Sequence, residues 1–513
     1  MKKILFYLSI SIIFIYGIYI RYYELGTGSF WIDEGYSSII SFFSNINNFN
    51  PYLPTGKYDF SQYLFTFFQT LSFKLFGISD YSARLTSFIL SILNMIVYLI
   101  FSIELLKNKK NNLIGIIFLF FIYVFSTWQI IWAREARFYE LLSFIYFINI
   151  YFIWKYANTN KIFYFLLYLV FTLSGIIFHP FCFGLIVIGI IIILYKIFIE
   201  KNRAKIGYFT GIVVILIIYY LIDLGFNYIS IGNIYTGESV PSINSIGKYN
   251  YLMFFNFYLK SLYSQLGIIL ISFILGIIYF TYRKKHLNLI IFGGVFLINI
   301  LLIPYGYMAH SRYMYHIYSI ITLIGGYNII LLYNYLSEEL NIDYRKIITS
   351  LFIIVTIFGI YKTYNITILA QRYYYIDYTS PKPNFKMAYK YLDENFIDYK
   401  IISGFPQLCY WYNINNIERC SYAININLLG ENDLNDILNK NQKENYTNIS
   451  YINNINDIEN LRLYFFVIDD LTLKNAINKD LIQQIKTKCT MIYKDIGNYE
   501  TSNFIGIWKC AYN

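Results

Sequence analysis

Residues 112–140 read NLIGIIFLFFIYVFSTWQIIWAREARFYE, an uncharged apolar run that ends in a short cluster of arginines and glutamates. A helix of roughly 20 apolar residues is long enough to cross the hydrocarbon core of a membrane. Similar runs recur through about the first 370 residues and then stop. The pattern predicts an all-α polytopic membrane domain over residues 1–370, with charged residues gathered at helix junctions.

The composition of the whole chain agrees with this prediction. Of 513 residues, 57% are hydrophobic, 21% are aromatic and 14% are charged, which excludes an ordinary soluble protein. The net charge of +11 comes from lysines and arginines in short clusters between the apolar runs. Such clusters are typical of membrane topology signals rather than of a nucleic-acid-binding surface, so no nucleic-acid partner is expected.

The apolar runs predict about eleven transmembrane helices. The first run follows Lys2 and Lys3 and lacks a small-residue cleavage pattern, so we interpret it as a retained helix rather than a signal peptide. A cytoplasmic N-terminus puts the basic loops inside, and the odd number of spans puts the C-terminus outside. The spans are approximately 4–20, 82–104, 112–130, 138–155, 162–178, 181–199, 206–223, 263–281, 287–304, 314–333 and 347–366.

Residues 378–513 have a different character, because polar residues rise and the apolar segments shorten to strand length. We expect a small extracytoplasmic α/β domain here. Its predicted elements are a helix over Asn384–Asn395 and strands at Ile401, Tyr464–Ile468, Thr490–Lys494 and Phe504–Trp508.

Four of the five cysteines lie in this C-terminal region: Cys409, Cys420, Cys489 and Cys510. An even set outside the membrane permits disulfides, and a hairpin turning near Tyr499 would place Cys489 opposite Cys510. Four unpaired thiols are the alternative. Metal binding is disfavoured because no CxxC spacing occurs.

The loop after the first span contains two adjacent carboxylates, Asp33 and Glu34, within Trp31–Ser37. A carboxylate within hydrogen-bond reach of an acceptor hydroxyl can take its proton during group transfer. The same pair also fits a solvated helix start with Asp33 as the N-cap.

Arg134 and Arg137 lie at the outer junction of the third and fourth spans. Arginine offers a planar, permanently charged fork that suits phosphate oxygens. The alternative is that both pair only with Glu135 and Glu140 or with anionic lipid head groups.

Two further junctions carry polar residues. His179 ends one span and is a candidate for binding a metal, a phosphate or an acceptor, although a single histidine at a helix end is more often structural. His310 and Arg312 precede the tenth span, where an arginine would stabilise a leaving phosphate or anchor the helix at the interface.

Taken in order, these segments resemble the membrane glycosyltransferases of the GT-C fold that are related to protein O-mannosyltransferases and lipid A aminoarabinose transferases. The resemblance covers roughly residues 1–335. The segments that carry it are Trp31–Gly35, Leu75–Gly77 with Tyr81–Leu85, Arg134–Tyr139 and Arg312-Tyr313.

The resemblance implies that a polyprenyl-phosphate sugar donates to an envelope glycolipid, polysaccharide or protein, by direct displacement with inversion. Asp33 becomes the leading candidate for the base and Glu34 a candidate metal or acceptor contact. The candidates for the donor phosphate are Arg134, Arg137, Tyr139 and Arg312.

One segment departs from the family pattern. Many relatives carry His-Pro-Pro-Leu-Tyr after the first loop, where this chain has Tyr58–Tyr63. His179 or Asp59 is a candidate substitute for that histidine as an acceptor or metal contact, so a divalent metal stays an open question.

Two other functions compete with the transferase. An O-antigen ligase or polymerase usually keeps its key residues in a large late loop, whereas the carboxylate pair here lies in the first loop. A flippase or transporter for a polyprenyl-linked glycan predicts charged residues near mid-membrane and repeat symmetry, of which the sequence shows little.

Overall fold

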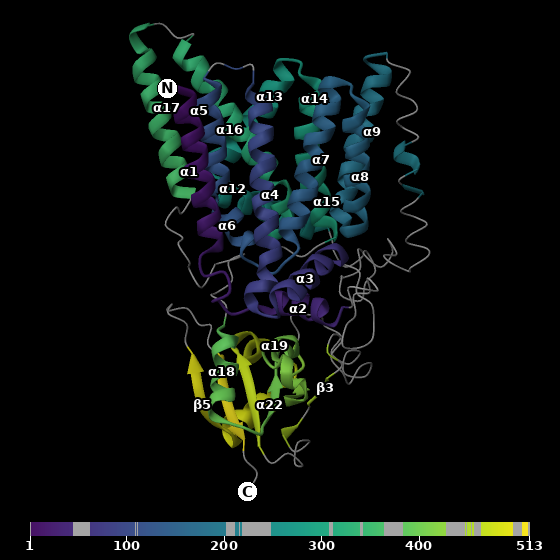
Figure 1. Cartoon of the computed structure of the whole chain (residues 1–513), viewed down its shortest axis with the longest axis vertical. Helices are drawn as coiled ribbons and strands as arrows, with labels where there is room; N and C mark the ends of the chain where they lie inside the picture. The colour runs from purple at the N-terminus through teal and green to yellow at the C-terminus, as the bar shows by residue number, and fades with distance from the viewer. Residues whose placement is uncertain are drawn as a thin grey trace. The chain divides into compact units, whose positions relative to one another are not determined.

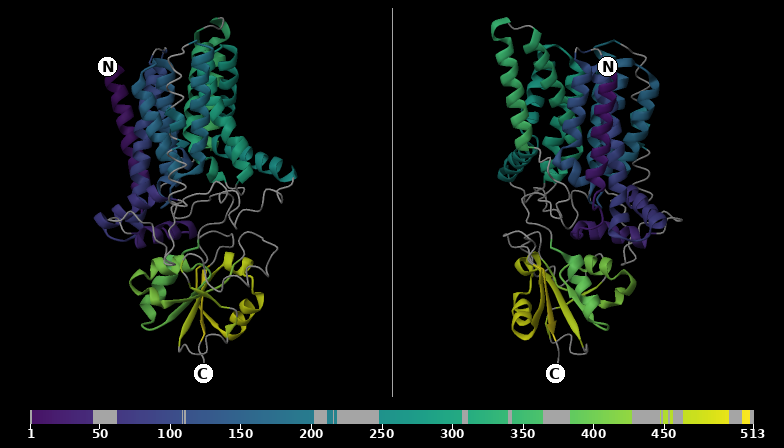
Figure 2. Two further views of the ribbon diagram at one scale, coloured as in Figure 1. Left: turned by 90° about the vertical axis from the view of Figure 1, so that its right-hand side faces the viewer. Right: turned by 60° about the vertical axis from the view of Figure 1, so that its left-hand side comes forward.

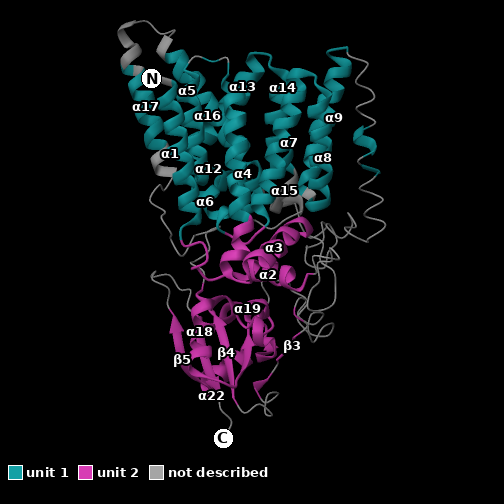
Figure 3. Cartoon of the chain, viewed as in Figure 1, with its two compact units in different colours: residues 1–23, 87–134, 138–370 teal, residues 24–86, 135–137, 371–513 magenta. Residues whose placement is uncertain are grey.

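The structure is a computed structural model of the chain, and its described residues form two compact units (Figure 3). Unit 1 comprises residues 1–23, 87–134 and 138–370, and unit 2 comprises residues 24–86, 135–137 and 371–513. The described residues are 2–44, 62–107, 109, 111–201, 211–214, 216–217, 248–306, 311–338, 342–363, 383–426, 447, 449–452, 454–455, 463–495 and 505–510.

Unit 1 is helical, and most of its helices run roughly parallel to one another (Figure 1, Figure 2). The first turns of α4 belong to unit 2. The helices are α1 (Lys2–Tyr22), α4 (Asp80–Leu106), α5 (Asn112–Val124), α6 (Thr127–Ala133), α7 (Tyr139–Thr159), α8 (Ile162–Phe178), α9 (Phe183–Phe198), α12 (Lys248–Leu266), α13 (Ile268–Tyr282), α14 (His286–Asn288), α15 (Gly294–Gly306), α16 (Tyr315–Glu338) and α17 (Ile342–Thr363).

Among the described residues, three helices are long and apolar enough to cross a membrane: 3–22, 80–106 and 312–336. Two bent helix pairs raise the number to five if each pair is one span. Shorter apolar helices cover Ile162–Phe178, Phe183–Phe198, His286–Leu301 and Thr349–Gly359. Most of the predicted span 206–223 lies outside the described residues.

Residues 112–130, which we expected to form one membrane-spanning helix, form two helices in the structure. Helices α5 and α6 meet at an angle of 53°. Ser126 lies between them with an extended backbone, and its hydroxyl donates to Tyr318 Oη at 2.8 Å. A side chain that finds a partner outside its helix favours such a break.

The predicted span 263–281 is also divided. Gly267 has a φ of 50°, which lies in the left-handed region that glycine adopts without a steric penalty. On either side of it, helices 255–266 and 268–282 are bent by 111°. The straight apolar helix therefore begins at Ile268, five residues later than the sequence prediction.

Unit 2 begins with two helices after the first span, α2 (Ile32–Phe43) and α3 (Tyr63–Phe76). Gly77, with a φ of 77°, ends α3. Ser79 and Ser82 then start α4 by reciprocal bonds, because each hydroxyl accepts a hydrogen bond from the other's backbone N–H at 3.0–3.2 Å. Such a capping box satisfies two of the backbone N–H groups that a helix start leaves without partners.

The C-terminal residues of unit 2 form a six-stranded sheet of order β3-β2-β1-β4-β6-β5. Strands β3, β2, β1 and β4 are mutually parallel, whereas β6 runs antiparallel to both β4 and β5. The strands are β1 (Lys400–Ser403), β2 (Cys420–Ala423), β3 (Ser450–Tyr451), β4 (Tyr464–Asp469), β5 (Thr490–Asp495) and β6 (Ile505–Cys510).

Helices cover this sheet and share its apolar core. Asn384 starts α18 by accepting a hydrogen bond from Met387 N, and strand β4 is buried along its whole length. Its first five residues, Tyr464–Ile468, are hydrophobic, as expected for a strand covered on both faces, and Asp469 at its end caps the helix that follows. The helices are α18 (Phe385–Asn395), α19 (Pro406–Tyr412), α21 (Asp470–Asn475) and α22 (Lys479–Lys488).

Unit 2 combines residues 24–86 with the C-terminal residues. The reason is packing between α2 and α19. A Cβ on Gly35 would lie 2.6 Å from Leu408 Cδ2, so the two helices approach closely because residue 35 has no side chain. One apolar cluster contains both Ile39 of α2 and Leu408 of α19.

Candidate functional site

The carboxylate pair lies in the first turn of α2. Trp31 is the N-cap residue, so Asp33 is inside the helix rather than capping it. Acidic groups in a first turn interact favourably with the partial positive charge of the helix N-terminus. Consecutive helical residues point about 100° apart around the axis, so the two carboxylates face different surroundings.

Glu34 is fully buried, and both of its oxygens are bonded. Oε1 accepts from Arg84 Nε and from Ala136 N, each at 2.8 Å. Oε2 accepts from Arg84 Nη2 at 3.0 Å and from Trp31 N at 3.3 Å. These contacts join α2, α4 and the 135–137 segment within unit 2. They favour a structural role for Glu34 over the metal or acceptor contact considered from the sequence.

Arg84 was assigned no role from the sequence, yet it organises this part of unit 2. Besides its bonds to Glu34, Arg84 donates through Nη1 to the carbonyls of Leu25 and Gly28, at 3.1 and 2.9 Å. A further bond from Nη2 reaches the Ser29 carbonyl at 3.2 Å. With the two bonds to Glu34, all five guanidinium N–H donors have an acceptor. Arg84 therefore fixes the loop that leads into α2.

Asp33 differs from Glu34 because 29% of its side chain is exposed. Its Oδ2 lies 3.7 Å from Arg137 Nη2. Arg137 Nη1 also donates to the Asp33 carbonyl at 3.0 Å and to Ser37 Oγ at 2.7 Å. Arg137 thus holds the backbone of Asp33 while the carboxylate stays partly accessible, as a base that meets an acceptor requires.

Arg134 belongs to unit 1, where it binds the end of α1. Its Nη1 donates to the carbonyls of Ile20 at 2.9 Å and Arg21 at 3.3 Å, and also to the carbonyl of Tyr23. The last carbonyls of a helix have no partner within it, and a cation there is favourable. This contact gives Arg134 a helix-capping role that the sequence analysis did not consider.

Tyr139 and His179 both stack on the ring of Phe138 in unit 1. The Phe138 ring stacks on Tyr139 with centroids 4.4 Å apart and on His179 with centroids 5.1 Å apart. His179 Nδ1 also accepts from Phe181 N at 3.3 Å. Both candidates are buried, and His179 ends α8 as the sequence indicated.

Arg312 lies near this aromatic cluster. It belongs to a short 3-10 helix, Ser311–Met314, and is half-buried. Its guanidinium carbon is 5.6 Å from the centroid of Tyr313, whose ring lies 6.0 Å from that of Phe181. The Phe181 ring in turn lies 4.5 Å from His179. Unit 1 therefore brings Tyr139, His179 and Arg312 into one connected cluster.

A second buried polar network was not identified from the sequence. Glu140 is fully buried and accepts from Asn94 Nδ2 at 2.9 Å and from Tyr315 Oη. Arg21, also buried, donates to the carbonyls of Gly17 at 3.0 Å and Val124 at 2.9 Å. Charges inside a helical bundle are costly unless they are bonded in this way. The signal available beforehand was Glu140 itself, which the sequence analysis treated only as a partner for arginines.

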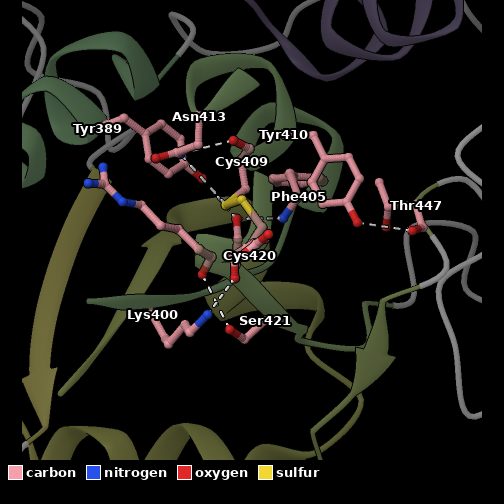
Figure 4. Close-up of a disulfide and its surroundings, with 12 residues drawn as sticks. Tyr389, Lys400, Phe405, Cys409, Tyr410, Asn413, Cys420, Ser421 and Thr447 are labelled. Atoms are coloured by element: carbon pink, nitrogen blue, oxygen red, sulfur yellow. Dashed lines mark hydrogen bonds between the residues drawn. A yellow bond between two sulfur atoms is a disulfide. The ribbon is translucent and has the colours of Figure 1, made fainter. Parts of the chain in front are cut away.

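The remaining candidates concern metals and cysteines. His310 and Asp59 lie outside the described residues. Within the described ranges, no three His, Cys, Asp or Glu side chains group as a metal site. Disulfides join Cys409 to Cys420 and Cys489 to Cys510 (Figure 4 shows one of them). Cys489 and Cys510 flank the antiparallel pair β5 and β6, and the turn near Tyr499 is outside the described residues.

Comparison with known proteins gives the fold. No protein-family model and no curated protein sequence matches the chain. The chain is similar to the crystal structure of ArnT from Cupriavidus metallidurans in the apo state, with a TM-score of 0.52 and 9% identity over 98% of this chain and 97% of that one. It is also similar to ArnT from the same organism bound to undecaprenyl phosphate, with a TM-score of 0.50, 10% identity and the same coverage. The chain therefore has the GT-C fold of ArnT and is a multi-pass membrane protein.

Proposed function

We propose that this protein is a glycosyltransferase that moves a sugar from a polyprenyl-phosphate carrier to a cell-envelope acceptor at the extracytoplasmic face. The observation that carries the proposal is the likeness along 98% of the chain to a structure bound to undecaprenyl phosphate. The acceptor is a glycolipid, a polysaccharide or a protein. No nucleotide sugar is required, because the carrier phosphate is the leaving group.

Asp33 is the base in this proposal. The acceptor oxygen attacks the anomeric carbon from the face opposite the phosphate, and its proton passes to the Asp33 carboxylate. The bond between the anomeric carbon and the phosphate oxygen breaks, and the phosphate leaves with the electron pair. A partly exposed carboxylate held by Arg137 suits this role, whereas the fully bonded Glu34 supports the loop.

Arg312 is the best candidate for the carrier phosphate. The guanidinium groups of Arg134 and Arg137 are buried and donate to backbone carbonyls, whereas Arg312 is half-buried beside Tyr313. A guanidinium placed near the phosphate stabilises the charge that develops as the sugar departs. Tyr139 and His179 lie in the same aromatic cluster and would line the approach of the carrier.

The test is sugar transfer by the purified full chain in detergent, supplied with radiolabelled polyprenyl-phosphate sugars and envelope extract. We expect Asp33→Asn to abolish transfer while binding of the labelled carrier is retained. Asp398→Asn, at an exposed position in the C-terminal residues, is the matched control and should transfer as the wild type does.

Two outcomes would overturn the proposal. Transfer by Asp33→Asn at the wild-type rate would remove Asp33 as the base. Absence of transfer from every carrier, together with movement of labelled carrier across liposomes, would establish the flippase alternative instead.

A further inference from the structure

The short helix α19 is fixed to the C-terminal sheet. It follows β1 directly, and the Cys409–Cys420 disulfide ties it to the start of β2 (Figure 4). The position of α19 is therefore set by the sheet rather than by its own seven residues.

The other side of α19 reaches the start of α4. Trp411 Nε1 donates to Asp80 Oδ1 at 2.7 Å. Lys386, at the start of α18, pairs with Asp80 Oδ2 at 2.7 Å and donates to the Gly26 carbonyl at 2.9 Å. Asp80 and Arg84 are four residues apart and so lie on the same face of α4. Two helices of the C-terminal region thus hold the turn that carries Arg84.

The same helix holds the loop before α2. Tyr412 Oη accepts from Phe30 N at 2.7 Å, and Phe30 is fully buried. The Phe30 ring stacks on Trp411 with centroids 5.0 Å apart. The Arg84 guanidinium carbon lies 4.9 Å from the centroid of that ring. Phe30 is therefore packed between Trp411 of α19 and the Arg84 guanidinium, which binds Glu34.

We infer that Trp411 and Tyr412 are positioning residues for the carboxylate turn of α2. Trp411 and Tyr412 contact Asp80 and Phe30, and these two residues hold Arg84. Arg84 in turn binds Glu34, which is the neighbour of Asp33 in α2. This inference rests on the proposed function, because it gives the C-terminal sheet a part in catalysis. The sheet then serves as a rigid base for the active carboxylate, since a small misplacement of a reacting group is costly in rate.

The hydrogen bonds of Tyr412, a partly buried residue, support this arrangement. Burial raises the pKa of its hydroxyl well above the usual value, and the hydroxyl, like that of any tyrosine, carries its proton at neutral pH. A protonated hydroxyl accepts from Phe30 N and still has a hydrogen to share with Ser29 Oγ, 3.3 Å away. Its removal would leave the buried Phe30 N–H without this acceptor.

The experiment compares Tyr412→Phe and Trp411→Phe with Tyr410→Phe in the full chain. Tyr410 is on the same helix, but its hydroxyl bonds to Thr447, so Tyr410→Phe is the matched control. We expect roughly tenfold faster hydrogen–deuterium exchange in peptides covering residues 29–36 of the first two variants, the size of change that one lost buried hydrogen bond produces. Peptides covering β4 should keep wild-type protection in all three.

Steady-state transfer is the second readout. For Tyr412→Phe and Trp411→Phe we expect kcat to fall roughly tenfold or more, with KM for the carrier changed less than about twofold, because neither residue is proposed to bind the carrier. A general loss of folding would instead change β4 protection and KM as well.

The outcomes separate this inference from the proposed function. Unchanged exchange over residues 29–36 in both test variants, or equal loss in Tyr410→Phe, would overturn the positioning role. If exchange is faster only over residues 29–36 and the wild-type protein is inactive on every carrier, the contacts of Trp411 and Tyr412 are supported and the proposed sugar transfer is refuted.

Discussion

Replacing Glu34 by glutamine should destabilise unit 2 severely, although the two side chains have nearly the same shape. The carboxylate accepts four hydrogen bonds, from Arg84 Nε and Nη2, Ala136 N and Trp31 N. An amide keeps only one oxygen, and its NH2 group would face donors on the other side. Arg84 would then be a buried cation without its counter-charge.

The expected magnitude follows from that burial. Removing one partner of a buried ion pair costs about 3–5 kcal/mol. For a domain of 150–250 residues, each kcal/mol lowers the melting temperature by about 2–4 °C, so we expect a fall of roughly 6–20 °C. The measurement is thermal unfolding of the purified protein in detergent, followed by tryptophan fluorescence, since Trp411 packs on the Phe30 ring beside Arg84.

Two substitutions make the measurement specific. Glu394→Gln removes an ion pair whose side chains are 59% and 60% exposed, and such pairs contribute little, so no measurable change is expected. Asp33→Asn should also melt near the wild-type temperature, because Asp33 is partly exposed and 3.7 Å from Arg137. A Glu34→Gln protein that melts within about 1 °C of wild type would refute the structural role of the Glu34–Arg84 pair.

Two further predictions concern the C-terminal region. Replacing Cys489 and Cys510 together by serine should lower the free energy of unfolding by about 3 kcal/mol, because the bridge closes a loop of 21 residues; guanidinium unfolding measures this, and an unchanged midpoint would contradict it. Burial raises the pKa of Asp469 to about 6, although the hydrogen bonds from Thr472 act to lower it. The folded state therefore binds a proton at Asp469 more tightly than the unfolded state does. The free energy of unfolding should then fall as the pH rises from about 4 to about 6. Asp469→Asn should flatten that dependence in melting curves across the same pH range, and an equal slope in both proteins would show that other groups cause it.

Much of unit 1 follows from hydropathy, since long apolar runs leave few alternatives to a helix in a membrane. The runs 4–20 and 82–104 lie within α1 and α4, and 162–178 has the same bounds as α8. The breaks at Ser126 and Gly267 were not predicted, because an average over an apolar window does not register one residue with a distant partner or a positive φ.

Sequence patterns predicted only some of the strands in the sheet. Strand β4 contains the five-residue hydrophobic run Tyr464–Ile468 and was predicted from the sequence, whereas β2 (Cys420–Ala423) and β3 (Ser450–Tyr451) were not. Short strands are stabilised by their neighbours more than by their own residues. The pairing of β2 with β1 depends on contacts between residues about 20 positions apart, which local patterns do not contain.

In the sequence analysis only the family resemblance separated the roles of Asp33 and Glu34. Both residues are acidic and adjacent, so residue type and spacing treat them alike. What separates them is Arg84, whose five donors form a closed set around Glu34 and the preceding loop. A helix turns about 100° per residue, so fixing Glu34 inward directs Asp33 to a more exposed side. The buried carboxylate thus orients the exposed one, and the proposal of Asp33 as the base depends on the contacts of Glu34 as much as on its own.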